Sequence, residues 1–276
     1  MLYVPANVPR FVGKSAGAGA DAVVLDLEDS VPPAEKAPAR DRLAASIATA
    51  RAGGSAVLVR VNRPLGQAAR DMEAAAAGGA EGILLSKTLG PEHVALAAEL
   101  LAPGMVILSM IETAAALLRV EAIAAAHPAV HGLLIGGEDL ATDLNADPED
   151  EILVQAKRRM AIAAAAARVF AYGTLGTVAK FRDQEHVRRV AEAAKRAGFA
   201  GATCIHPSLV PVLRAAYAPS EAELDWARRV IAAADAAAAE GRGSLTVDGR
   251  MVDEPVVERA RRVLAATGLV IEPSSG

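Results

Sequence analysis

The stretch MVILSMIETAAALLRVEAIAAAHPAVHGLLIGGEDL, residues 105–140, decides the fold. It begins with a short apolar run, passes through an alanine-rich segment, and returns to a second short apolar run. Apolar runs that are continuous rather than alternating are typical of parallel strands covered on both faces. The alanine-rich segment predicts a helix, because alanine is the strongest helix former. We therefore expect a strand, a helix and a second, parallel strand from this stretch.

The same alternation of apolar runs and helical segments extends along most of the chain. The predicted strands are Leu2–Val4, Ala22–Glu28, Ala56–Asn62, Gly82–Lys87, Met105–Ile111, Gly132–Glu138, Tyr172–Val178 and Gly201–His206. An open, doubly wound sheet usually carries a glycine-rich phosphate turn after its first strand, whereas the turn here, PANVPRF, has no glycine. Eight alternations without that turn favour an α/β fold of the (β/α)₈ TIM-barrel type.

The C-terminal part of the chain differs from the barrel pattern. Ser220 with Glu223 forms a capping-box pattern, so we expect a helix from Glu221 to about Ala239. A GRGS hinge follows, then LTVDGRMVD with a turn at Asp248-Gly249, and Glu254-Pro255 begins a final helix. We predict a barrel domain over residues 1–240 and a C-terminal extension over 241–276.

Composition narrows the class of protein. The net charge is −4 and the basic residues are scattered, so nothing indicates binding to nucleic acid. No apolar run reaches the ~18 residues of a membrane span, and the first residues do not resemble a signal peptide. The single cysteine, Cys204, cannot form an internal disulfide, which suits a reducing compartment. We expect a cytoplasmic protein without membrane contact.

Polar residues gather where the predicted strands end. They are Asp26, Glu28, Asp29, Arg60, Asn62, Lys87, Glu112, Glu138, Asp139 and His206. Barrel enzymes build their active sites at the carboxyl ends of the strands. Strands also end where water begins, which explains any one of these residues but explains less well why six strands share the feature.

Glu112 and Asp139 follow two neighbouring predicted strands. Mg²⁺ prefers oxygen ligands and commonly takes one or two protein carboxylates, leaving positions for water and substrate. The pair is therefore a candidate Mg²⁺ site. The alternative is that Glu112 caps the helix that follows it, where a negative charge is favourable.

Arg60 and Lys87 supply positive charge between these carboxylates. An arginine can hold a carboxylate with two hydrogen bonds or stabilise an enolate. The alternative is a buried ion pair with Asp26 or Glu28, and both interpretations can hold together. His206, just before a proline, is either a substrate-binding group or a hydrogen-bonded core residue.

These residues lie in segments that resemble a known family. The segments are LYVPANVPRF, GADAVVLDLEDSVPPAEKAPAR, VRVN, GILLSK, SMIETAAAL, GGEDLATDL, GFAGATCIHPS, YAPSEAELDWARRV and DGRMVDEPVVERARRVL. In this order, from residue 2 to about 266, they are similar to the citrate lyase β-subunit family. That family belongs to the HpcH/HpaI aldolase group, with the malyl-CoA and citramalyl-CoA lyases.

The resemblance implies a barrel of the phosphoenolpyruvate/pyruvate-binding type with a C-terminal lid, and a Mg²⁺-dependent carbon–carbon lyase. It implies cleavage or formation of a malyl-, citramalyl- or citryl-type thioester, with an acetyl thioester and a 2-oxoacid as the other partners. It assigns the metal to Glu112 and Asp139, and the oxoacid or enolate to Arg60. It places Asp253, on the lid, over a neighbouring subunit's site as general acid–base, in a trimer or hexamer.

The remaining expected pocket residues are substrate-binding. They are Asp26, Glu28, Asp29, Lys87, Glu138 and His206. The sequence departs from the family pattern at Ala6, Ser86, Gly176, Ala202 and Leu209. An Arg-Ser pair usually precedes the first strand and is not seen here, so either the start is misassigned or that thioester contact is absent.

Because these departures fall where substrate binds, other functions stay open. One is the β subunit of a citrate lyase complex, acting on an acyl-carrier-protein thioester with partner subunits. Another is an aldolase for free 2-oxoacids, although the DGRMVDEPV segment favours thioesters. A barrel that binds a ligand without catalysis is the third.

Overall fold

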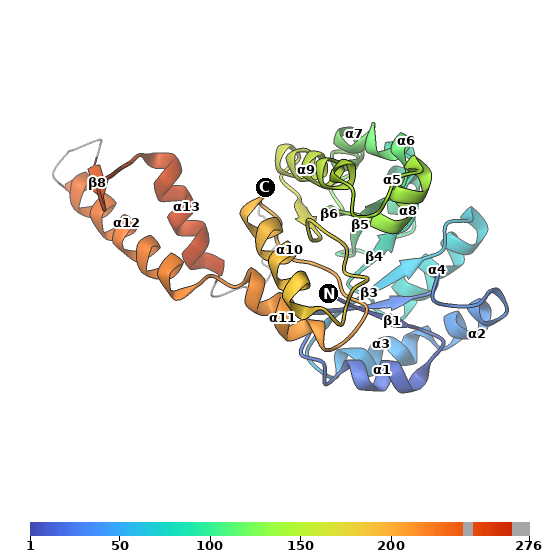
Figure 1. Cartoon of the computed structure of the whole chain (residues 1–276). Coiled ribbons are helices and arrows are strands. Elements are labelled where there is room, and N and C mark those ends of the chain that lie inside the picture. Colours follow the sequence, from blue (N-terminus) through green and yellow to red (C-terminus); the bar gives the residue numbers. More distant parts are fainter. Residues whose placement is uncertain (240–244, 267–276) are drawn as a thin grey trace. The chain divides into compact units, whose positions relative to one another are not determined.

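The computed structural model describes residues 1–239 and 245–266, and it divides the chain into two compact units, Met1–Tyr217 and Ala218–Gly276. The first unit contains a curled sheet of seven parallel strands whose spatial order follows the chain (Figure 1). The strands are β1 (Leu2–Pro5), β2 (Ala22–Asp26), β3 (Ala56–Val61), β4 (Gly82–Leu85), β5 (Val106–Ile111), β6 (Val130–Ile135) and β7 (Phe170–Tyr172). The predicted α/β fold with a parallel sheet is confirmed.

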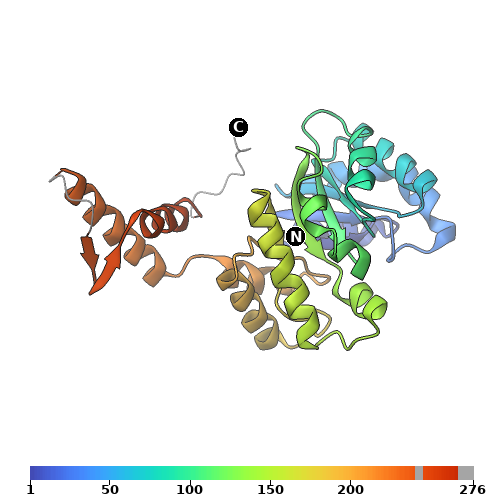
Figure 2. The same cartoon turned by 90° about the horizontal axis from the view of Figure 1, so that it is seen from above.

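Helices connect the strands and cover the outer face of the sheet (Figures 1 and 2). They are α1 (Pro9–Ser15), η1 (Pro33–Glu35), α2 (Lys36–Asp41), α3 (Leu43–Arg51), α4 (Leu65–Ala77), α5 (Pro91–Ala98), α6 (Ala114–Leu117), α7 (Val120–Ala124), α8 (Gly137–Leu144), α9 (Glu151–Ala166), α10 (Gln184–Arg196) and α11 (Leu209–Tyr217). Apolar side chains of most of these helices and the outward residues of the strands form one large core, as expected when parallel connections cross over through helices. Leu140 and Ala141 of α8 pack with Leu153 and Ala156 of α9 in a separate cluster.

The two faces of the sheet bury different side chains. In β2, Val23 and Leu25 belong to the large outer core, whereas Ala22 and Val24 belong to a smaller cluster inside the curl. Successive side chains of a strand point to opposite faces, so this alternation is expected. Both faces are apolar, which explains why the strand sequences are continuous apolar runs.

The inner cluster fixes where the polar residues point. Its buried members are Ala22, Val24, Leu58, Leu84, Leu108, Met110 and Leu134. Asp26, Arg60 and Glu112 each lie two residues beyond a member of this cluster, on the same side of their strands. The strand period of two therefore directs all three side chains into the curl, at its carboxyl end.

The eighth predicted strand, Gly201–His206, forms only two isolated bridges among the described residues. Gly201 pairs with Tyr172 of β7, and Cys204 pairs with Leu2 of β1. The backbone of Tyr3 donates to the Cys204 carbonyl at 2.9 Å. The ladder cannot extend far beyond Cys204 because Pro207 has no N–H to donate.

Five strands end earlier than predicted, β2, β3 and β4 by one or two residues and β6 and β7 by more. β6 stops at Ile135, and Gly137 begins α8, so Glu138 and Asp139 lie in the first turn of a helix. Acidic side chains are favoured there by the helix dipole. β7 stops at Tyr172, because Gly173 turns the chain with φ 144°.

The second unit is a small helix–hairpin–helix assembly. It comprises α12 (Glu221–Ala239), β8 (Leu245–Val247), β9 (Arg250–Val252) and α13 (Glu254–Ala265). The predicted capping box is present: the Ser220 backbone donates to Glu223 at 2.7 Å, and the Glu223 backbone donates to Ser220 at 3.2 Å. The hairpin turns through Asp248 and Gly249, whose positive φ values of 50° and 72° match a two-residue turn.

Along the chain, the boundary between the two compact units falls between Tyr217 and Ala218. The sequence had suggested a domain boundary at residue 240. α12 lies with the second unit because its Ala227 and Val230 share a core with Val252 and Val257. The predicted GRGS hinge, residues 241–244, lies outside the described residues. Across residues 1–239 and 245–266, no helix has the length and apolar character to cross a membrane.

Candidate active site

The carboxyl end of the sheet contains a buried ion pair between neighbouring strands. Arg60 of β3 donates from Nε and Nη2 to the two carboxylate oxygens of Asp26 of β2, each at 2.7 Å. Although burial opposes it, the hydrogen bonds from Arg60 hold the pKa of Asp26 below its ordinary value. The bidentate pair confirms the predicted ion pair, and it fixes the plane of the guanidinium group.

Two further acidic residues, Glu28 and Asp29, contact the positively charged groups of Arg60 and Lys87 at this end of the sheet. Arg60 Nη1 lies 2.9 Å from Glu28 Oε2 and 3.3 Å from Asp29 Oδ2. The ammonium group of Lys87 forms an ion pair with Glu28 and lies 3.3 Å from Asp29 Oδ1. Glu28 is buried, but the side chain of Asp29 is 53% exposed. Asp29 is therefore the partner that an anionic ligand displaces most easily.

Two supporting residues were not anticipated from the sequence. The ring of Tyr3 lies under the Arg60 guanidinium at 5.2 Å, a cation–π contact that holds the cation from inside the curl. Lys36 donates to the carbonyls of Leu27 and Glu28 at 2.8 and 2.6 Å, which orders the acidic loop. Tyr3 could have been noticed in the sequence, because it is a tyrosine on an otherwise apolar strand.

Glu112 is the most constrained carboxylate of the site. It is 2% exposed, and its Oε2 accepts a hydrogen bond from the backbone N–H of Lys87. Burial raises the pKa of Glu112 to about 7, with contributions from the negative charges of Asp139 and Glu28. Lys87 adopts a left-handed backbone, φ 45°, in the conformation that makes this hydrogen bond.

The alternative role for Glu112, as a helix cap, is wrong. Thr113 caps α6 instead, because its hydroxyl accepts from Ala116 N at 3.1 Å. The backbone N–H of Ala114 donates to Asp143 at 2.7 Å. The helix end is thus satisfied without Glu112, which leaves that carboxylate turned into the curl.

The second oxygen of Glu112 indicates a missing partner. Oε1 is buried and has no hydrogen-bond partner within the described part of the chain. A Cβ atom placed on Gly136 would lie 2.6 Å from this oxygen, so only glycine leaves room for it. A buried carboxylate oxygen without a partner is costly, and a cation is a natural way to satisfy it.

Asp139 supplies the second carboxylate. It lies in the first turn of α8, and its charge acts on the pKa values of both Glu112 and Lys87. Among the residues described, no group of three or more His, Cys, Asp and Glu side chains could hold a metal. Two carboxylates suit Mg²⁺, which keeps several positions for water and substrate. Glu112 and Asp139 therefore fit the ion.

The remaining predicted residues are less closely tied to this cluster. Glu138 is exposed and accepts a hydrogen bond from Thr177 at 3.1 Å, beside a cavity of about 200 Å³. His206 is also exposed, so its interpretation as a core residue is wrong. Its Nδ1 lies 2.7 Å from Ser208 Oγ, and its ring stacks on Phe181 at 5.1 Å.

Asp253 belongs to the second unit. Its side chain accepts a hydrogen bond from Val256 N at 3.3 Å and caps α13. Helix capping is a sufficient structural reason for an aspartate at this position. Its catalytic role stays a prediction.

Comparison with known proteins identifies the family of the chain. The family described as HpcH/HpaI aldolase/citrate lyase matches residues 1–207. The chain belongs to this family. A (3S)-malyl-CoA thioesterase from Cereibacter sphaeroides is 36% identical over 96% of this chain and 93% of its own. The citrate lyase subunit beta of Escherichia coli is 34% identical over 98% of this chain and 93% of its own.

Solved structures of the family include a similar protein from Mycobacterium tuberculosis. Its CitE protein, in complex with magnesium, acetoacetate and coenzyme A, matches with a TM-score of 0.80 and 33% identity, covering 97% of both chains. The citrate lyase beta subunit of that organism, complexed with oxaloacetate and magnesium, has a TM-score of 0.68 and 32% identity over 79% of this chain. The resemblance inferred from the sequence is confirmed.

Proposed function

We propose that the protein is a Mg²⁺-dependent carbon–carbon lyase for a 3-hydroxyacyl thioester. Malyl-, citramalyl- and citryl-CoA are the candidate substrates, and an acetyl thioester and a 2-oxoacid are the products. The observation that carries the proposal is the buried Oε1 of Glu112, which lacks a partner in the described residues and lies near the Asp139 charge. The magnesium-bound relatives support the same function.

Glu112 and Asp139 would hold the ion. When bound, Mg²⁺ supplies a Lewis acid for the 2-oxygen and a positive charge for the oxoacid carboxylate. Gly136 keeps the space beside Glu112 open, and the backbone of Lys87 orients its other oxygen. The protein thus orients the Glu112 carboxylate before substrate arrives, and the first turn of α8 supplies Asp139.

Arg60 and Lys87 provide the positive charge for the substrate anion. The two hydrogen bonds to Asp26 orient Arg60, while Nη1 lies 2.9 Å from the buried Glu28 and 3.3 Å from the exposed Asp29. A substrate carboxylate or a developing enolate can replace the exposed Asp29 at this donor. Arg60 then stabilises the charge that forms as the carbon–carbon bond breaks.

The C-terminal part would complete the site. We propose that residues 241–276 act as a lid on the barrel domain, residues 1–240, in which the two bridges at Gly201 and Cys204 stand for an eighth strand. Asp253 would act as general acid–base on a neighbouring subunit, in a trimer or hexamer. A cytoplasmic location stays a prediction.

Hydrolysis of the thioester is the second candidate function. A relative that covers nearly the whole chain is a (3S)-malyl-CoA thioesterase. The same acidic site could position water against the thioester carbonyl instead of cleaving the carbon–carbon bond. Three further functions stay open: catalysis within a citrate lyase complex, cleavage of free 2-oxoacids, and ligand binding without catalysis.

Product analysis separates these functions. The metal-depleted protein is incubated with malyl-, citramalyl- and citryl-CoA, with and without Mg²⁺, and products are identified by mass spectrometry. The lyase yields acetyl-CoA with glyoxylate, pyruvate or oxaloacetate, only with Mg²⁺, and Asp139→Asn lowers the rate by at least ~10²-fold.

Different products contradict the lyase. Free coenzyme A with an intact hydroxyacid identifies a thioesterase. Cleavage of a free 4-hydroxy-2-oxoacid, without turnover of any thioester, identifies an aldolase. Turnover of citryl thioester only after addition of citrate lyase partner subunits identifies a complex subunit, and no turnover in any of these assays supports ligand binding alone.

A further inference from the structure

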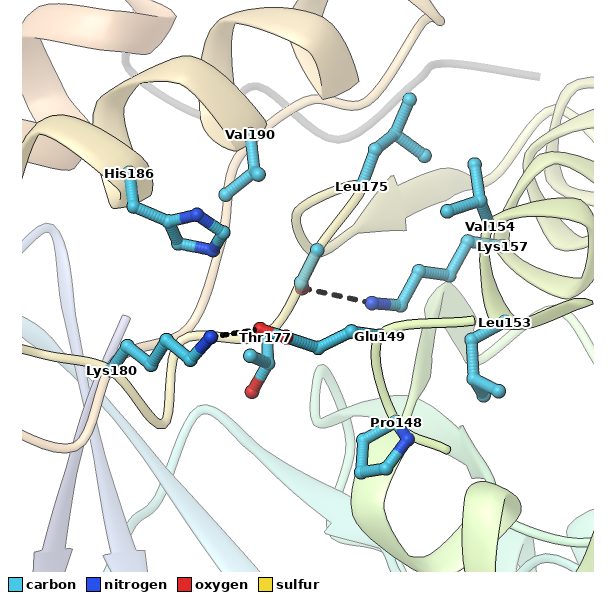
Figure 3. Close-up of a pocket in the computed structure, with 11 residues that line it drawn as sticks. Pro148, Glu149, Leu153, Val154, Lys157, Leu175, Thr177, Lys180, His186 and Val190 are labelled. Atoms are coloured by element: carbon cyan, nitrogen blue, oxygen red, sulfur yellow. Dashed lines mark hydrogen bonds and ion pairs between the residues drawn. The ribbon is translucent and has the colours of Figure 1, made fainter. Parts of the chain in front are cut away.

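A second cavity lies between α9, α10 and the loop that follows β7 (Figure 3). Its volume is about 320 Å³, which falls in the range of small-molecule sites. Its walls include Leu153, Val154 and Val190, and none of the residues of the acidic site lines it. It adjoins the cavity of about 200 Å³ beside Glu138, with which it shares Lys157, Gly176 and Thr177.

Lys157 of α9 carries a buried positive charge on the wall of this cavity. The residue is 7% exposed, and Nζ donates to the carbonyl of Gly176 at 2.9 Å. That carbonyl also accepts from Thr174 Oγ1 at 2.8 Å. No carboxylate forms an ion pair with Lys157 in the ranges that the structure describes. Burial lowers the pKa of Lys157 to about 8, and the charge of Glu138 opposes this effect.

His186 of α10 faces the same space from the opposite side. Its Nε2 is buried and has no hydrogen-bond partner within the described residues. This nitrogen lies 3.6 Å from the position that a Cβ atom on Gly176 would take, so Lys157 and His186 flank the same residue. Figure 3 shows the two side chains on either side of the loop that carries Leu175 and Thr177.

Among the described residues of the cavity wall, the single carboxylate is already engaged. Glu149 forms an ion pair with Lys180 at 2.6 Å, at an exposed edge of the cavity. It therefore does not neutralise Lys157. The cavity presents one buried ammonium group with unused donors and one unpaired imidazole nitrogen, against apolar walls.

We propose that this cavity binds a small carboxylate or phosphate anion, held between Lys157 and His186. The anion accepts hydrogen bonds from the ammonium group and from Nε2–H, which satisfies both groups at once. Charge-assisted hydrogen bonds of this kind are strengthened where apolar walls exclude water. The proposal does not depend on the lyase activity.

Calorimetric titration with inorganic phosphate and with malonate, in the presence of a chelator, tests the proposal. Lys157→Met and His186→Gln remove the two donors while keeping side chains of similar size. We expect each to weaken binding at least ~10-fold, the effect of losing about 1.4 kcal/mol. Lys14→Met, an exposed lysine on α1, is the control and should bind as the wild type does, and Lys87→Met reports any binding at the acidic site.

The two probes also identify the ligand class, since tighter binding of phosphate or of malonate assigns a phosphoryl or a carboxylate ligand. Absence of binding by either probe overturns the proposal. So does binding that Lys87→Met abolishes and Lys157→Met leaves unchanged, because the anion then occupies the acidic site. Lys157→Met removes an uncompensated buried charge, so the melting temperature of this variant should equal or exceed that of the wild type. When the fold is retained in this way, a loss of anion binding reflects the loss of the ammonium group and not unfolding.

Discussion

Glu112 occupies a position that destabilises the metal-free protein. Its carboxyl group is buried, and one oxygen has no partner within the described residues. Burial raises the pKa of Glu112 to about 7, above the ordinary value of 4.5. An acid with a raised pKa in the folded state ionises more readily in the unfolded chain, so stability is lost as pH rises from about 4.5 to about 7.

This linkage gives a prediction for Glu112→Gln. In a chelator, the free energy of unfolding of the variant should exceed that of the wild type by about 1–3 kcal/mol at pH 8, and the two should agree within about 1 kcal/mol at pH 5. Urea denaturation measures both values. Glu73→Gln, an exposed carboxylate on α4, is the control and should follow the wild type. A variant less stable than the wild type at pH 8 contradicts the account of this carboxyl group.

Single residues were predictable where apolar runs end. Glu112, Arg60 and Asp26 were predicted from their places at the carboxyl ends of such runs, whereas their direction into the curl is seen only in the structure, because both faces of the sheet are apolar. Gly136 was not predictable in the same way, because its importance depends on the distance between two strand ends. His206 was misjudged because its exposure depends on the loops around it.

Elements were predictable in type more than in extent. Apolar composition located six of the strands, whereas the predicted seventh, Tyr172–Val178, shares only Tyr172 with β7. The ends of β6 and β7 depend on glycines and on backbone pairing. Glu138 and Asp139 therefore lie in α8 rather than at the end of a strand. The predicted eighth strand forms only two isolated bridges in the described residues. Whether a segment forms a strand depends on hydrogen bonds with neighbouring strands, which its own sequence does not specify.

Asp253, at the start of α13, has a structural role as a helix cap and a proposed catalytic role, and two substitutions distinguish them. Asparagine caps a helix about as well as aspartate, so Asp253→Asn should leave the melting temperature within a few degrees of the wild type. If Asp253 transfers the proton, the same variant loses at least ~10²-fold in kcat. Asp253→Ala is the comparison, because it removes both the cap and the acid. Full activity of Asp253→Asn, with reduced stability of Asp253→Ala alone, assigns the residue to capping.

At the scale of the whole molecule, the candidate site residues are divided between the two compact units. The first unit brings together the two candidate metal ligands and the cations Arg60 and Lys87. The second unit carries Asp253 on its own small core. The order of motifs along the chain predicted the family, which the match over residues 1–207 confirms. Subunit assembly could not be predicted in the same way, because the sequence of one chain does not show which of its surfaces contact another subunit.

The central claim is that Glu112 and Asp139 together hold one Mg²⁺, and calorimetric titration of the metal-depleted protein with Mg²⁺ tests it most directly. We predict one ion per chain at pH 8, with affinity about 10-fold lower at pH 6, because a proton competes for Glu112 below its pKa of about 7. Glu112→Gln and Asp139→Asn should each lose at least ~30-fold in affinity, about 2 kcal/mol, while Glu73→Gln retains it. Binding by either of the first two variants with the affinity of the wild type would contradict the claim.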